Sequence, residues 1–211
     1  MIRKAILPDP WLSDHNSRKE AIQMRLRDFA SIVPEEYFYE LIFCILTPQS
    51  KAEHAEAVIA KLKADNFYEV GFDPTEYLRD PRHYIRFHNV KSKRLLNVRR
   101  IYPQLHPILL EKKLSPTELR AIVMELVSGL GLKESSHFLR NIGVRGLCIL
   151  DRHILRHLKE LKVIGSIPTS LTPKKYYEIE RKWLTYSEGV GIPMDELDLL
   201  FWSISTGEIR K

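Results

Sequence analysis

The sequence has 211 residues, with 33 Lys or Arg and 27 Asp or Glu, so its formal net charge is +6. This length suffices for one large domain or two small ones with a buried core, and the moderate positive charge is compatible with a polyanionic partner without requiring one. The only two cysteines, Cys44 and Cys148, lie in apolar runs and are too few for a zinc or iron–sulfur site, so we expect no bound metal. The sequence shows no signal-peptide pattern and no apolar run of membrane-spanning length, which predicts a soluble intracellular protein with no membrane partner.

Apolar residues recur at helical spacing along most of the chain, and no strand pair with hairpin-turn residues competes with them. The spacing predicts helices over 21–32, 36–46, 52–64, 93–102, 116–127, 133–142, 151–161, 174–185 and 194–204. Ser115 before Pro116 is typical of a helix start, and Asp151 is a favoured cap. The sequence therefore predicts an all-α fold.

Basic residues are concentrated between positions 82 and 100, a stretch without Asp or Glu. The seven are Arg82, Arg86, Lys91, Lys93, Arg94, Arg99 and Arg100. One interpretation is a surface that binds a polyanion, and the other is a solvated helix face that happens to be basic.

The segment LVSGLGLK, which runs from Leu126 to Lys133, predicts a tight turn between two helices. Gly129 and Gly131 can take positive φ angles and allow another backbone to approach. Exposed N–H groups at the start of the second helix would suit a DNA phosphate without reading its sequence, and Lys133 would then lie beside the bound strand. The alternative interpretation is a helix that ends at a glycine and is followed by an ordinary helix. The lysine and the later Asp151 favour a helix-hairpin-helix motif instead. Beside such a motif, DNA becomes the favoured partner of the basic stretch.

This order of hairpin, lysine and aspartate resembles the helix-hairpin-helix superfamily of DNA glycosylases. Three segments are more narrowly similar to the archaeal and bacterial 8-oxoguanine DNA glycosylase/AP lyases: KESSHFLRN at 133–141, ILDRHILR at 149–156, and LDLLFW at 197–202 with the chain running on to Lys211. The resemblance implies two helical subdomains that flank a cleft. We expect one to comprise residues 1–32 and 152–211, and the other residues 33–151 with the helix-hairpin-helix at about 116–142.

Lys133 and Asp151 are the catalytic candidates that this resemblance implies. In the family, the lysine amine displaces the damaged base, forms a Schiff base with the sugar and promotes β-elimination of the 3′ phosphate. An ionised aspartate can stabilise the positive charge that grows on the sugar. The structural alternatives are a solvated helix lysine for Lys133 and a helix cap for Asp151, and capping is compatible with catalysis.

Asp198 and Trp202 share one helix face at i,i+4 spacing and are candidates for base recognition. Trp202 could stack on an extruded purine or could be an ordinary core residue. The resemblance implies that the C-terminal Lys211 folds back into the base pocket and helps to recognise oxidised guanine.

The remaining DNA-binding candidates are Gly129 and Gly131 in the hairpin, Gln49, Asn89 and Arg152. The stretch from Leu41 to Ser50 is similar to the family's first core helix and the loop that meets the DNA gap, but Pro48-Gln49 departs from the variants typical of this branch. For Gln49 and Asn89, structural roles are the alternative.

Together these residues favour a bifunctional base-excision repair enzyme that removes 8-oxoguanine from double-stranded DNA and cleaves the strand at the abasic site. We expect it to need no cofactor and to act as a monomer. Two alternatives stay open: a glycosylase/lyase for another oxidised base, and a non-catalytic helix-hairpin-helix DNA-binding module.

Overall fold

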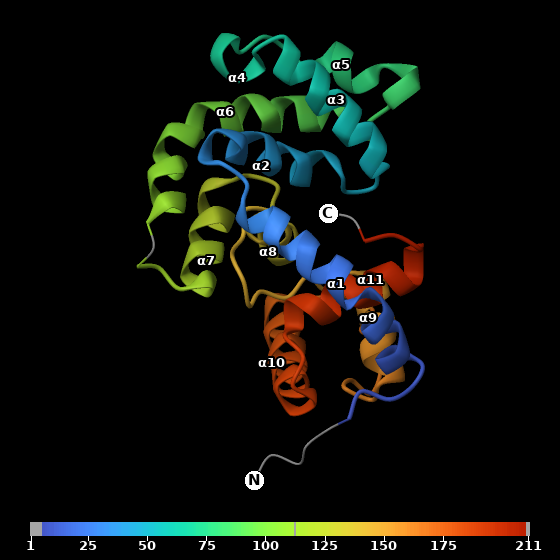
Figure 1. Cartoon of the computed structure of the whole chain (residues 1–211). Coiled ribbons are helices and arrows are strands. Elements are labelled where there is room, and N and C mark those ends of the chain that lie inside the picture. Colours follow the sequence, from blue (N-terminus) through green and yellow to red (C-terminus); the bar gives the residue numbers. More distant parts are fainter. Residues whose placement is uncertain (1–5, 112, 210–211) are drawn as a thin grey trace. The chain divides into compact units, whose positions relative to one another are not determined.

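The computed structural model describes residues 6–111 and 113–209, and within these residues it contains helices and no strands (Figure 1). The all-α prediction is therefore confirmed. The chain divides into two compact units. Unit 1 combines the residues up to Ser31 with those from Leu139 onward, and unit 2 is Ile32–Phe138.

Unit 2 is built around α2 (Tyr37–Leu46), whose side chains are buried at eight of its ten positions. α3 (Ala52–Ala64) and α6 (His88–Leu110) pack against α2. The other elements are η1 (Pro34–Glu36), α4 (Phe67–Val70), α5 (Thr75–Arg79), η2 (Pro81–His83), α7 (Pro116–Leu126) and the first part of α8 (Leu132–Asn141). Because α2 is apolar all round, it needs neighbours on several sides, and these helices supply them.

α6 continues for 23 residues although Pro103 and Pro107 lie inside it. A proline lacks the N–H that a helix interior requires and its ring crowds the preceding turn, so helices bend at such positions. Figure 1 shows α6 curving along its length. We predicted a helix that stopped at residue 102, and the structure differs because Leu105 and Leu109, beyond the first proline, are buried.

Unit 1 contains α1 (Trp11–Ala30), α9 (Arg152–Glu160), α10 (Pro173–Val190) and α11 (Met194–Thr206), together with the last residues of α8. α11 contacts α1, α9 and α10, so it is the central helix of this unit. Phe201 of α11 stacks with Trp183 of α10, with ring centroids 6.1 Å apart, and with His157 of α9 at 5.0 Å. These stacked rings form the core between the three helices.

The boundary between the units differs from the predicted division after residue 151. Residues 139–151 belong to unit 1 because three polar contacts attach them to its helices. Arg140 forms an ion pair with Asp198 at 2.9 Å, and the N–H of Gly146 donates to Asp195 Oδ2 at 3.0 Å. Arg145 Nη2 donates to the carbonyl of Leu26 at 2.6 Å. The other boundary, after Ser31, lies one residue from the predicted one.

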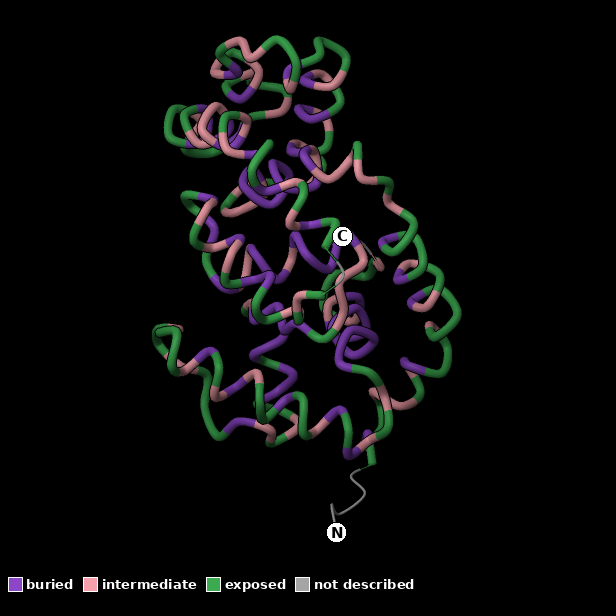
Figure 2. The backbone as a smooth tube through the Cα atoms, turned by 90° about the vertical axis from the view of Figure 1, so that its left-hand side faces the viewer, coloured by how far each residue is buried: buried purple, intermediate pink, exposed green. Residues whose placement is uncertain are grey.

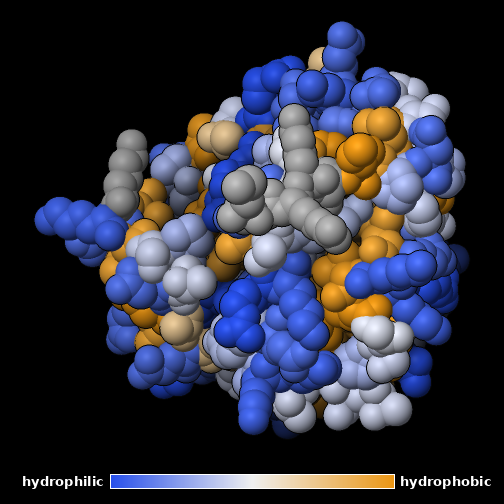
Figure 3. Space-filling model, turned by 90° about the horizontal axis from the view of Figure 1, so that it is seen from below, coloured by the Kyte–Doolittle hydropathy of each residue, from blue (hydrophilic) through white to orange (hydrophobic). Residues whose placement is uncertain are grey.

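Buried and exposed residues alternate along most helices of both units (Figure 2). Figure 3 shows one face on which apolar patches lie among hydrophilic side chains. Across residues 6–111 and 113–209, no helix has the length and apolar character needed to cross a membrane. Nor do any three His, Cys, Asp or Glu side chains of those residues gather closely enough to hold a metal ion.

Candidate active site

The predicted helix-hairpin-helix consists of α7, α8 and the turn between them, which is formed by Val127–Gly131. Ser115 begins α7 with a reciprocal capping box, in which its side chain accepts from the Glu118 N–H and the Glu118 carboxylate accepts from the Ser115 N–H. Three apolar side chains, Val127, Leu130 and Leu132, are buried and anchor the hairpin. Ser128, Gly129 and Gly131 are exposed, so the backbone between the anchors faces outward.

Gly129 has a φ angle of +95°, which L side chains rarely adopt. A Cβ atom at this position would lie 2.4 Å from Nε of Arg94, so the Arg94 side chain, which extends from α6, packs directly against the glycine. Gly131 differs from our expectation because its φ is not in the left-handed region. A Cβ there would meet only Oε2 of Glu134, at an ordinary 3.5 Å.

Lys133 is the second residue of α8, directly after the hairpin. Its side chain is 35% exposed, and its Nζ lies 3.2 Å from Oε1 of Glu134. Contacts beside the lysine fix α8 in unit 2, because Ser135 and Ser136 are fully buried and Arg120 donates to Ser136 Oγ at 3.1 Å. The helix therefore holds the base of the lysine rigidly and leaves its amine accessible.

Asp151 caps α9, as its position in the sequence indicated. Its Oδ1 accepts from the N–H groups of His153 and Ile154, both at 2.8 Å. In the described part of the chain its second oxygen, Oδ2, accepts no hydrogen bond. The carboxylate is partly exposed, so one oxygen fixes the helix and the other is available for chemistry.

Asp198 lies inside unit 1, where its carboxylate pairs with the Arg140 guanidinium. Burial is the main cause that raises the pKa of Asp198 to about 7, and the neighbouring carboxylates Asp151 and Asp195 raise it further against the lowering effect of Arg140. Burial also raises the pKa of Asp195. The structure thus gives Asp198 an internal partner, which the i,i+4 spacing with Trp202 did not reveal.

The other predicted residues lie on open parts of the two units. Trp202 of α11 is partly exposed, unlike its neighbour Phe201 in the core. Gln49, Asn89 and Arg152 are exposed, and Arg152 Nε lies 3.3 Å from His153 Nε2. Lys211 lies outside the described residues.

Most of the seven clustered basic residues make contacts within the protein. Arg82 pairs with Asp80, and Arg99 donates to the carbonyls of Tyr68 and Glu69 at 2.6 Å. Lys91 is buried, and Arg94 covers the hairpin glycine. The stretch is therefore only partly a solvated basic face, with Arg86, Lys93 and Arg100 exposed.

Comparison with known proteins shows which branch of the helix-hairpin-helix glycosylase superfamily this chain matches. Residues 22–192, which include the hairpin, Lys133 and Asp151, match the family described as 8-oxoguanine DNA glycosylase. The chain belongs to this 8-oxoguanine DNA glycosylase family. The predicted family is therefore confirmed.

Relatives of this glycosylase cover nearly the whole chain. It is 43% identical over 196 residues to the 8-oxoguanine DNA glycosylase/AP lyase of Fusobacterium nucleatum, covering 89% of each chain. The crystal structure of the Methanocaldococcus jannaschii 8-oxoguanine DNA glycosylase is similar with a TM-score of 0.82 and 33% identity, covering 95% of this chain and 94% of the other. A structure of the M. jannaschii glycosylase/lyase in complex with a 15mer DNA containing 8-oxoguanine is similar with a TM-score of 0.81 and 31% identity, covering 95% and 99%.

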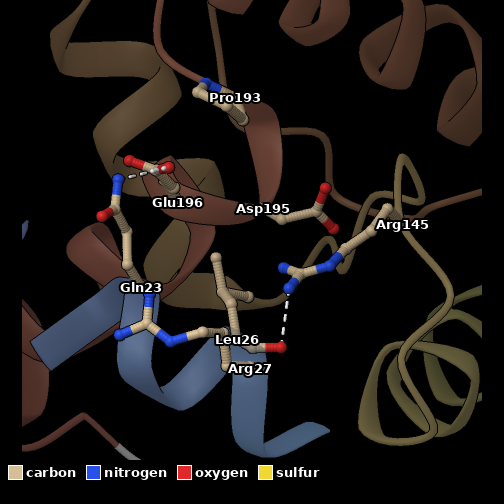
Figure 4. Close-up of a pocket in the computed structure, with 7 residues that line it drawn as sticks. All are labelled: Gln23, Leu26, Arg27, Arg145, Pro193, Asp195 and Glu196. Carbon is tan, nitrogen blue, oxygen red and sulfur yellow. Dashed lines mark hydrogen bonds between the residues drawn. The ribbon is translucent and has the colours of Figure 1, made fainter. Parts of the chain in front are cut away.

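A pocket in unit 1 of this glycosylase contains none of the predicted site residues. Its volume is about 380 Å³, and it is lined by Gln23, Leu26, Arg27, Arg145, Pro193, Asp195 and Glu196 (Figure 4). Gln23 donates to Glu196 at 3.3 Å, and Arg145 donates to the Leu26 carbonyl. Because these polar groups bind one another, the residues that line the pocket connect α1 with the start of α11.

The sequence pattern places Lys91 and Arg94 on the basic face of this glycosylase and does not predict their contacts within the protein. For Lys91 a signal was present, because it precedes Leu95 by four residues and Val98 by seven and so shares their buried helix face. Arg94 carried no such signal, since its contact with Gly129 joins residues distant in the sequence.

Proposed function

We propose that this glycosylase removes 8-oxoguanine from double-stranded DNA with Lys133 as its nucleophile and then cleaves the strand at the abasic site. The observation that carries the proposal is the position of Lys133, in the first turn of the hairpin helix of a chain from this family. A lysine there would lie beside a strand whose phosphate contacts the hairpin amides.

The proposed reaction starts with attack of the neutral Lys133 amine on C1′ of the damaged nucleotide, and the base leaves with the glycosidic electron pair. Opening of the sugar ring then gives a Schiff base between the lysine and C1′. Loss of a proton from C2′ expels the 3′ phosphate and breaks the strand. Glu134, 3.2 Å from the amine, is a nearby carboxylate that could accept a proton from it.

Asp151 would stabilise the positive charge that develops on the sugar as the base leaves. This role needs a carboxylate oxygen that the protein itself does not bind, and Oδ2 meets that requirement while Oδ1 keeps the side chain in place. The proposed steps use no metal ion, so we expect EDTA to leave the excision rate unchanged.

For base recognition, we propose that Trp202 stacks on the extruded purine and that Lys211 contacts the oxidised base. The partial exposure of Trp202 supports the first role. Deletion of Lys211 is then expected to slow excision of 8-oxoguanine while leaving the lyase reaction on an abasic site unchanged. Equal loss of both reactions would contradict a role in base recognition.

The proposed partner is double-stranded DNA in the nucleoid, bound by one copy of the chain. Gly129 and Gly131 would contact phosphate through backbone amides, and Arg152 through its exposed guanidinium. Gln49 and Asn89 are exposed and would contact the strand near the lesion. Light scattering of the protein–DNA complex would test the proposed stoichiometry of one chain per duplex.

Excision from a panel of duplexes, each with one modified base, tests the substrate. The proposal predicts the highest kcat/KM on 8-oxoguanine and a strand break at the same position. Preference for an oxidised pyrimidine would overturn the substrate and keep the lyase, whereas binding without any break would favour a DNA-binding module.

A further inference from the structure

Lys91 is a buried cation whose partners are backbone and hydroxyl oxygens rather than carboxylates. Only 3% of the residue is exposed. Its Nζ donates to the carbonyls of Leu46 and Pro48, both at 2.7 Å, and to Ser50 Oγ at 3.3 Å. Within the described ranges of the chain, no carboxylate forms an ion pair with it. The ammonium group thus fastens the 47–50 loop to the C-terminal end of α2, where a positive charge is favourable.

Burying a charge in this way is unfavourable unless hydrogen bonds compensate for it. Burial lowers the pKa of Lys91 to about 8, and the nearby charge of Arg94 acts in the same direction. An apolar side chain on the face shared with Leu95 and Val98 would avoid this cost. Unlike an apolar residue, Lys91 fixes the geometry of the 47–50 loop through hydrogen bonds of its Nζ.

The same network joins the loop to the segment before α6. Ser50 Oγ accepts from the N–H of Arg86 at 3.0 Å as well as from Lys91. The carbonyl of Phe87 accepts from the N–H of Lys91 at 3.0 Å. Lys91 therefore holds residues 46–50 through its side chain and Phe87 through its main chain.

Two strained residues flank this network. Gln49 has a φ of 58° and Phe87 a φ of 61°, and neither is a glycine. Both are exposed, Phe87 by 50%, and the Arg86 guanidinium lies 5.0 Å from the centre of its ring. Non-glycine residues in the left-handed region persist only where surrounding contacts enforce them, and they cluster at functional sites.

We propose that Lys91 is a positioning residue that presents Gln49 and Phe87 together to DNA at the lesion. The amide of Gln49 suits the hydrogen-bonding edge of a base, and the ring of Phe87 suits the face of an unstacked one. With the backbone at both residues held beforehand, the protein spends less binding free energy on ordering the loop when it extrudes the damaged base. This inference rests on the proposed function, because it concerns the base-extrusion step of that reaction.

The test compares Lys91→Met and Ser50→Ala with a control, Lys182→Met, which removes the same charge from an exposed position in α10. Single-turnover rates are measured for each full-length variant on a duplex with 8-oxoguanine and on a duplex with a preformed abasic site. The abasic site carries no base to extrude, so a loop that acts in extrusion affects the first substrate selectively.

We expect Lys91→Met and Ser50→Ala to slow 8-oxoguanine excision by about tenfold or more, while abasic-site cleavage and both rates of Lys182→Met stay within about twofold of wild type. The double variant should be no slower than Lys91→Met alone, since both changes break one network. If Lys91→Met does not fold, Ser50→Ala carries the same expectation.

Equal losses on both substrates, or excision rates of Lys91→Met and Ser50→Ala equal to that of Lys182→Met, would overturn the positioning role. Failure of the wild type to excise 8-oxoguanine would instead overturn the proposed function, and the inference with it.

Discussion

At the scale of single residues, Asp151 divides two tasks between its two carboxylate oxygens. Asn caps helices nearly as well as Asp, so Asp151→Asn keeps the cap and removes the charge. We expect its thermal stability to change by less than about 1 kcal/mol and its single-turnover excision rate to fall by about 100-fold or more. Near-wild-type excision by a folded Asp151→Asn variant would show that the residue only caps α9.

The two hairpin glycines differ in what a side chain would meet. Gly129→Ala places a Cβ against Arg94 at an unfavourable φ, whereas Gly131→Ala meets only an ordinary contact with Glu134. We expect Gly129→Ala to lower the free energy of unfolding by about 1–3 kcal/mol and to weaken binding to an undamaged duplex. Chemical denaturation and fluorescence anisotropy would measure both effects, with Gly131→Ala as the control. Equal effects of the two substitutions would contradict this account of the hairpin.

Lys133 and Asp151 could be proposed as catalytic residues from the sequence because their nearest neighbours in the chain carry the signal. The hairpin glycines directly precede the lysine, and a capping position marks the aspartate. Lys91 and Asp198 could not be assigned in this way. The burial of Lys91 had a local signal, but the hydrogen-bond partners of both side chains lie more than 40 positions away, and no local pattern reveals them.

At the scale of elements, α6 carries two adjacent arginines with different surroundings. Arg99 donates to carbonyls of α4, whereas Arg100 is exposed and donates to Asn97 Oδ1. We expect Arg99→Ala to destabilise the fold by about 1–3 kcal/mol, because it leaves two carbonyls without their donor, and Arg100→Ala to leave stability within about 0.5 kcal/mol. Urea denaturation of the two variants measures this difference, and equal stabilities would contradict a stabilising role of the Arg99 hydrogen bonds to the two carbonyls.

α11 carries Asp198 into the core of unit 1, and its raised pKa has a consequence for stability. The folded-state pKa of about 7 lies above the ordinary value of 3.8, so the folded protein binds this proton more tightly than the unfolded chain. The contribution of Asp198 to the free energy of unfolding therefore falls as pH rises from about 4 to 7.

Asp198→Asn removes this titration. Between pH 5 and pH 7.5, the stability of wild type minus that of Asp198→Asn should fall by more than about 1 kcal/mol. Denaturant unfolding of both proteins at the two pH values provides the measurement. A difference that does not change with pH would mean that Asp198 is ionised throughout.

Helix positions could be predicted where an apolar face is continuous, and α3 has the predicted bounds of Ala52–Ala64. The start of α1 was missed by ten residues because its first turns expose polar side chains and bury few apolar ones. α4 and α5 are four and five residues long and too short to show a period. They depend on contacts with α3, which only the folded chain supplies.

At the scale of the whole molecule, unit 2 contains the hairpin and Lys133, and unit 1 contains Asp151 and Trp202. α8 belongs to both, because the division falls between Phe138 and Leu139. Covalent capture of DNA by one lysine would show which residue of this chain performs the chemistry.

Borohydride trapping on a duplex with a single 8-oxoguanine tests the central claim most directly. Reduction converts a Schiff base into a stable bond, so wild type should form a covalent protein–DNA adduct. Lys133→Gln should form none while still binding the duplex, and Lys182→Gln, a substitution of an exposed lysine in α10, should trap like wild type. An undiminished adduct with Lys133→Gln would contradict the assignment of Lys133 as the nucleophile.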